Sequence, residues 1–99
     1  MELTFKPERL TIIRRLKGLS ITDIDAKMRE ISGGKYKMNI DRWEKVAAKR
    51  TIENVTLLAR ATEVPLGFYY YNTVEITMAN NLVEIYIPDT KELIAFKFI

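Results

Sequence analysis

The sequence predicts a mainly α-helical protein: a five-helix bundle over residues 1–71, followed by a small antiparallel β meander over residues 72–99. Three observations support this prediction. Apolar residues recur at helical spacing from Pro7 to about Tyr69, with helix-starting and helix-ending residues between the segments. After Asn72 the apolar period falls to two residues, which is typical of strands. The length of 99 residues is that of one ordinary domain.

The first two helices are delimited by capping residues. Pro7 suits the first helical position, where its missing N–H is not needed, and Gly18 is placed to end this helix in a left-handed cap. Ser20 is the expected cap of a second helix, and Asp23, three residues later, faces the positive end of its dipole. The apolar stripe and the break of the second helix are expected at Ile24, Met28, Ile31 and Ser32-Gly33-Gly34.

Three further helices are expected before residue 72. The third runs from near Tyr36 to about Ala48, the fourth covers Ile52–Thr62, and a short fifth starts at Pro65. Their apolar sides are expected to be Ile40, Trp43 and Ala47, then Val55, Leu58 and Ala59, then Leu66, Phe68 and Tyr69.

The meander is predicted from alternating apolar residues and turn signals. Residues 73–79 alternate and form either a first strand or an irregular linker. Asn80-Asn81 tolerates the positive φ of a two-residue turn. The strands Leu82–Ile87 and Leu93–Ile99 then flank a turn at Pro88-Asp89-Thr90-Lys91.

The composition excludes several kinds of chemistry. Without cysteine or histidine the chain has no disulfide, no thiolate nucleophile and no usual zinc ligand. There is no Gly-rich phosphate loop, and carboxylates such as Asp23, Asp25, Asp41 and Glu44 are expected on helix surfaces, either solvated or in ion pairs. No apolar run approaches the roughly 20 residues of a membrane helix. We therefore expect a cytoplasmic protein that is not an enzyme and needs no cofactor or metal.

The charge is divided unevenly along the chain. Residues 1–50 hold 13 basic and 7 acidic residues, a net charge of +6, whereas residues 51–99 hold 3 basic and 6 acidic residues, a net charge of −3. This asymmetry favours a polyanion-binding face on the helical part. The alternative is a chance distribution of solvated charges.

Two short helices, a Gly-containing turn and a third helix with basic residues at its start are typical of a helix–turn–helix DNA-binding unit. Residues 7–20 resemble the opening of Cro/repressor-type (Xre family) domains. Ile40-Asp41-Arg42-Trp43-Glu44 resembles their "I-S-R-W-E" segment, and residues 59–66 resemble their "A-x-A-L-x-V-P" segment. The resemblance covers about residues 5–70, and it implies a lambda-repressor-like five-helix bundle that binds operator DNA, commonly as a dimer.

The resemblance also implies roles for individual residues. Its base-reading positions fall on Lys37, Met38 and Arg42, with Asn39 and Asp41 nearby, and Arg or Lys suits guanine while Asn suits adenine. An ion pair between Arg14 and Glu44 would link the first and third helices. Phosphate contacts are expected from Lys35, Tyr36, Lys45, Lys49 and Arg50. The alternative for all these side chains is an ordinary solvated face.

The chain departs from the family in the turn between helices two and three, which is about five residues longer than in related proteins. Either the second helix extends to Ile31, or Arg29–Lys35 forms a protruding loop. Arg29 and Lys35 suit phosphate binding and simple solubility equally.

The aromatic and apolar residues leave two further choices. Trp43 is expected in the core rather than in a ligand stack, and Tyr69-Tyr70-Tyr71 is expected to seal the bundle rather than to stack on RNA bases. The last strands carry apolar side chains on both faces, more than one half-buried hairpin needs. We expect a dimer interface formed by Leu93, Ile94, Phe96 and Phe98, the alternative being that both faces pack within one chain.

The sequence thus predicts a sequence-specific transcriptional regulator, in the first instance a repressor, that binds a two-fold operator of double-stranded DNA as a homodimer. One alternative is an antitoxin or phage-type inhibitor whose β region binds another protein, such as a toxin or an inhibited enzyme. Another is a single-strand nucleic-acid binder that uses the basic loop and the tyrosines. None of these involves a membrane.

Overall fold

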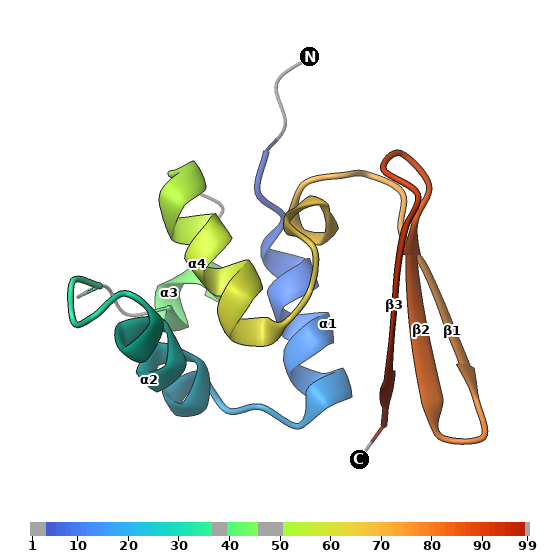
Figure 1. Ribbon diagram of the computed structural model, residues 1–99, viewed down its shortest axis with the longest axis horizontal. Coiled ribbons are helices and arrows are strands. Elements are labelled where there is room, and N and C mark those ends of the chain that lie inside the picture. Colours follow the sequence, from blue (N-terminus) through green and yellow to red (C-terminus); the bar gives the residue numbers. More distant parts are fainter. Residues whose placement is uncertain (1–3, 37–39, 46–50, 99) are drawn as a thin grey trace.

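The computed structural model describes residues 4–36, 40–45 and 51–98, in which four α-helices precede a three-stranded antiparallel sheet (Figure 1). The class is therefore a mixture of helices and sheet rather than mainly α. A short 3-10 helix, η1, connects the two parts and occupies the place of the expected fifth helix. The elements are α1 (Pro7–Lys17), α2 (Ile21–Ile31), α3 (Asp41–Lys45), α4 (Ile52–Thr62), η1 (Leu66–Tyr69), β1 (Glu75–Ala79), β2 (Leu82–Ile87) and β3 (Glu92–Lys97).

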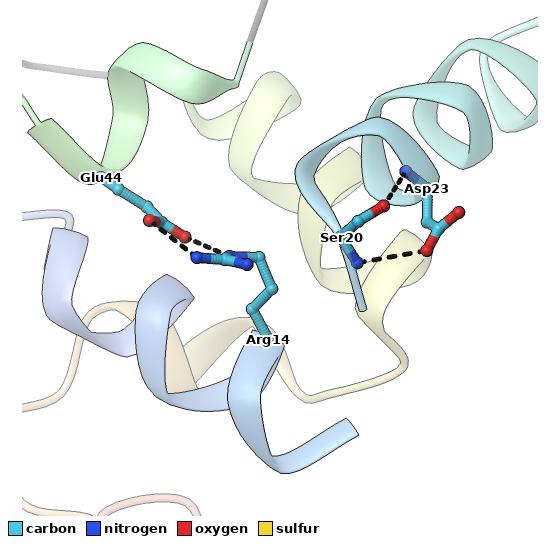
Figure 2. Close-up of polar contacts among 4 residues, drawn as sticks. All are labelled: Arg14, Ser20, Asp23 and Glu44. Atoms are coloured by element: carbon cyan, nitrogen blue, oxygen red, sulfur yellow. Dashed lines mark hydrogen bonds and ion pairs between the residues drawn. The ribbon is translucent and has the colours of Figure 1, made fainter. Parts of the chain in front are cut away.

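The caps of α1 and α2 confirm the sequence signals. Gly18 has a φ of 65° and closes α1 in the left-handed conformation. At the start of α2, the Asp23 N–H donates to the Ser20 hydroxyl over 3.0 Å, and the Ser20 N–H donates to the Asp23 carboxylate over 3.1 Å (Figure 2). The hydrogen bond from the Ser20 N–H to the carboxylate is the main cause that lowers the pKa of Asp23. The helix breaks after Ile31, as expected.

The third helix begins later than the sequence indicates. The prediction placed its start near Tyr36, but Tyr36 is not helical and α3 starts at Asp41. Side chains of α2 and its turn account for the delay: the Tyr36 N–H donates to the Ser32 hydroxyl over 2.9 Å, and the Ile40 N–H donates to the Asp25 carboxylate over 3.2 Å. An Ile40 N–H that is bound to Asp25 is not available for a hydrogen bond to the Tyr36 carbonyl, which a helix starting near Tyr36 would need. The expected end, including Ala47, lies outside the described residues.

The core is a single cluster to which both parts of the chain contribute. Trp43 has no exposed surface, which confirms its expected place in the core. Phe5 lies edge-to-face with Trp43 at 5.6 Å between ring centroids and stacks on Tyr69 at 5.8 Å. Of the predicted stripe of α2, Ile24 and Met28 are buried, whereas Ile31 is only partly buried.

The sheet confirms the predicted meander, with strand order β1-β2-β3. Its first turn uses positive φ at Asn80 and Asn81, 54° and 66°. Ile85 on the central strand pairs with Ile76 on one side and Ile94 on the other. The inner face of β2 is fully buried and belongs to the same core cluster as the helices, through Val83, Ile85 and Ile87.

Two cations of α1 bind the later parts of the chain, and the sheet stands beside α1 (Figure 1). Arg9 is buried, and its guanidinium donates to the carbonyl oxygens of Phe68 and Asn72, each over 2.8 Å. Burial lowers the pKa of Arg9. The Lys17 ammonium donates to the Thr62 carbonyl over 2.7 Å and lies 4.6 Å from the centre of the Phe96 ring. These contacts fix the end of η1, the end of α4 and β3 to one helix.

Candidate nucleic-acid interface

The candidate interface is formed by α2, the turn after it and α3. The turn projects from the helical body on the side away from the sheet (Figure 1). The inner side of α3 is marked by Trp43, which is completely buried, as is Ile40 just before the helix. Arg42, one residue before Trp43, is therefore on the outer side of the helix and is exposed. A short helix held by its inner side, with a cation on its outer side, is suited to contact a polyanion.

An ion pair fixes α3 against α1, as the sequence predicts. The Arg14 guanidinium binds the Glu44 carboxylate with both ends, Nε to Oε1 over 2.6 Å and Nη2 to Oε2 over 3.3 Å (Figure 2). The side chains are 27% and 16% exposed, so the pair is largely removed from solvent. The hydrogen bonds to Glu44 raise the pKa of Arg14. Two parallel hydrogen bonds constrain orientation as well as distance, so the pair sets the angle of α3 on α1.

Replacing Arg14 by alanine should lower the free energy of unfolding by about 2 kcal/mol, because Glu44 loses a charge-assisted hydrogen-bond partner in a partly buried place. The matched control is Arg15→Ala on the same helix, where the side chain is exposed and the loss should stay below about 0.5 kcal/mol. Urea denaturation measures both values. Arg14→Met combined with Glu44→Leu should regain much of the loss. Equal losses for the two arginine variants would contradict the structural role of the pair.

Asp25 is a structural residue of the interface that sequence reasoning missed. We expected it on a solvated surface, but it is only 9% exposed. Its Oδ1 accepts hydrogen bonds from the Tyr36 hydroxyl and from the Ile40 N–H, both over 3.2 Å. A signal was present, because Ile21, Ile24, Asp25 and Met28 have the spacing of a core-facing helical stripe. Asp25 stands where that stripe expects an apolar residue, and it ties the entry of α3 to α2.

The predicted DNA-contacting residues differ in where the structure places them. Arg42 and Lys35 are exposed. Tyr36 corrects the prediction: its side chain is 5% exposed and its hydroxyl binds Asp25, so it anchors the turn instead of reaching for phosphate. Lys45 is the last residue of α3. The other predicted contacts lie outside the described residues: Lys37, Met38, Asn39, Lys49 and Arg50.

The predicted dimer residues divide into two pairs. Ile94 and Phe96 are partly buried against the protein's own core, which is the alternative that the sequence left open for the inner face. Leu93 and Phe98 remain 59% and 40% exposed. The tyrosine run is likewise not a row of free rings, since Tyr69 is fully buried and its two neighbours are partly buried.

Within residues 4–36, 40–45 and 51–98, no group of three acidic, cysteine or histidine side chains is close enough to hold a metal ion. In the same part of the chain, every helix is too short or too polar to cross a membrane. Comparisons of the chain with protein-family models, with curated proteins and with solved structures found no match.

Proposed function

We propose that the protein is a sequence-specific transcriptional regulator, acting as a repressor, in which α2 and α3 form a helix–turn–helix of the Cro/repressor type. The observation that carries this proposal is the way α3 is held. Arg14 fixes it to α1, Asp25 fixes its entry to α2, and Arg42 stays on the outer side. A helix that reads base edges must keep its angle and depth in the groove, and this arrangement supplies both constraints.

The charge of the helical half supports a duplex as the ligand. The net charge of +6 in residues 1–50 favours binding to phosphates, with release of condensed counterions. Base readout is assigned to Arg42, and on sequence grounds to Lys37, Met38 and Asn39. Phosphate contacts are assigned to Lys35, Lys45, Lys49 and Arg50. A bound protein would repress by occluding polymerase, without a cofactor.

The proposal includes a homodimer, because one recognition helix reads only a few base pairs. Two copies spaced by one DNA turn, about 34 Å, would read an inverted repeat. β3 supports this part, since it is an edge strand of the sheet that carries the exposed Leu93 and is followed by the exposed Phe98. Exposed edges of this kind are ready to pair with another chain.

Selection of bound duplexes from random DNA tests the function. The proposal predicts an enriched inverted repeat with half-sites about 10 base pairs apart. Enrichment of a single half-site would overturn the dimer and keep the readout. Recovery of duplexes with no common sequence would overturn sequence-specific regulation and would favour a protein-binding role for the sheet.

A further inference from the structure

The segment between α2 and α3 runs from Ser32 to Ile40 and is more than twice as long as the usual turn of about three or four residues. Its described first part is ordered by its own hydrogen bonds. The Gly33 N–H donates to the Glu30 carbonyl over 3.2 Å, and the Gly34 N–H donates to the Arg29 carbonyl over 2.8 Å. The two glycines have φ values of 67° and 85°, which a residue with a Cβ rarely adopts.

The same bonds change the electrostatics of the end of α2. Unpaired carbonyls at the carboxyl end of a helix carry partial negative charge and repel phosphate. Here the Arg29 carbonyl accepts from the Gly34 N–H and also from the Ser32 hydroxyl, the latter over 3.1 Å. The turn therefore covers negative atoms that would otherwise face an approaching polyanion.

The described first part of the turn ends at Tyr36, which is anchored in the core. Tyr36 is buried, with its hydroxyl on Asp25 and its N–H on the Ser32 side chain. Lys35 lies between this anchor and Gly34, whose N–H binds Arg29, so the hydrogen bonds bring Lys35 and Arg29 to the same part of the turn. Both side chains are exposed, and neither makes an ion pair or a side-chain hydrogen bond within the described residues.

We propose that the end of α2 and this turn form a second DNA contact, in which Arg29 and Lys35 each bind a backbone phosphate beside the bases that α3 reads. This inference rests on the proposed function. Phosphate contacts need cations held in a fixed position, not complementarity to base edges. The end of α2 and the anchored turn provide two such cations, whose backbone positions are fixed by the hydrogen bonds described above. Its contribution is then independent of sequence, and it fixes how far α3 enters the groove.

Glu30 is exposed in the last turn of α2 next to Arg29, and it allows a test in which DNA affinity should rise instead of fall. If the turn faces phosphates, this carboxylate opposes binding. Glu30→Gln should therefore tighten binding to every duplex. A turn that faces only solvent predicts no change in either direction.

The decisive experiment compares two double variants. The first carries Arg29→Gln and Lys35→Gln, and the control carries Arg60→Gln and Lys91→Gln. The control residues are exposed cations of α4 and of the β2–β3 turn. Affinity for the selected duplex and for a scrambled duplex is measured as a function of salt concentration. The first variant should flatten the slope of log K against log salt by about 1.8 on both duplexes, since each phosphate contact contributes roughly 0.9. The control should keep the wild-type slope.

The outcomes separate the two proposals. If the Arg29/Lys35 variant binds the selected duplex with the affinity and the salt slope of the wild-type protein, the role of the turn is overturned and the proposed function is kept. A loss confined to the selected duplex would also overturn it, because that pattern belongs to base contacts. Failure of the wild-type protein to bind any duplex would overturn the proposed function and this inference together.

Discussion

Ile85→Ala should lower the free energy of unfolding by about 3 kcal/mol, because it removes a large side chain from a fully packed place. Ile85 is 1% exposed on the central strand, between Ile76 and Ile94. The control is Met78→Ala on β1 of the same sheet, at a position that is 52% exposed, where the loss should stay within about 0.5 kcal/mol.

The Ile85→Ala variant also tests whether the helices and the sheet share one core, because Trp43 reports the state of the helices. It is the single tryptophan of the chain, and it is buried in the helical part. Its fluorescence in a urea titration should therefore report the helices, while Ile85 belongs to the sheet. The shared core predicts that Ile85→Ala moves the tryptophan transition as far as the circular dichroism transition. A tryptophan transition that stays at its wild-type midpoint would mean that the helices and the sheet unfold separately.

The second large effect is expected at Asp25. Asp25→Ala removes the acceptor of two buried donors, the Tyr36 hydroxyl and the Ile40 N–H, and should cost about 3 kcal/mol of stability. Asp25→Asn keeps an acceptor oxygen and should lose less than half as much. Glu30→Ala, at an exposed position of the same helix, is the control and should be close to neutral.

Asp25 also has a predicted effect on binding. Because it ties the entry of α3 to α2, Asp25→Ala should weaken binding to the selected duplex more than to a scrambled one at a temperature where the variant is folded. The turn that carries Lys35 is also anchored on Asp25, so binding to the scrambled duplex should fall as well, but by less, because the basic residues keep their charge. Equal losses on the two duplexes would contradict a positioning role for Asp25.

The predictions from sequence succeeded where the signal was local. Pro7, Gly18 and Ser20 each act within a few residues, and the helices they delimit begin and end where these residues indicate. The meander was predictable for the same reason, because its turns and its period of two are carried by neighbouring residues.

The errors occurred where distant residues decide the structure. The start of α3 depends on a carboxylate 15 residues earlier in the chain, and no local pattern at Tyr36 reveals it. Tyr36 stands in a basic run that favours a surface position, yet its ring is buried. Arg9 was missed because its acceptors are the backbone carbonyls of Phe68 and Asn72. The Arg14–Glu44 pair was anticipated because the family resemblance, not the spacing, supplied the partner.

The central claim is that the outer side of α3 reads bases, and repeating the selection from random duplexes with Arg42→Ala tests it most directly. The account predicts that the enriched sequence loses its preference at one base pair of each half-site and keeps the others. Affinity for the original site should fall by roughly 1–3 kcal/mol, while affinity for scrambled DNA changes little. The result that would contradict the account is an unchanged enriched sequence with equal losses on both duplexes, because Arg42 would then contact phosphate alone.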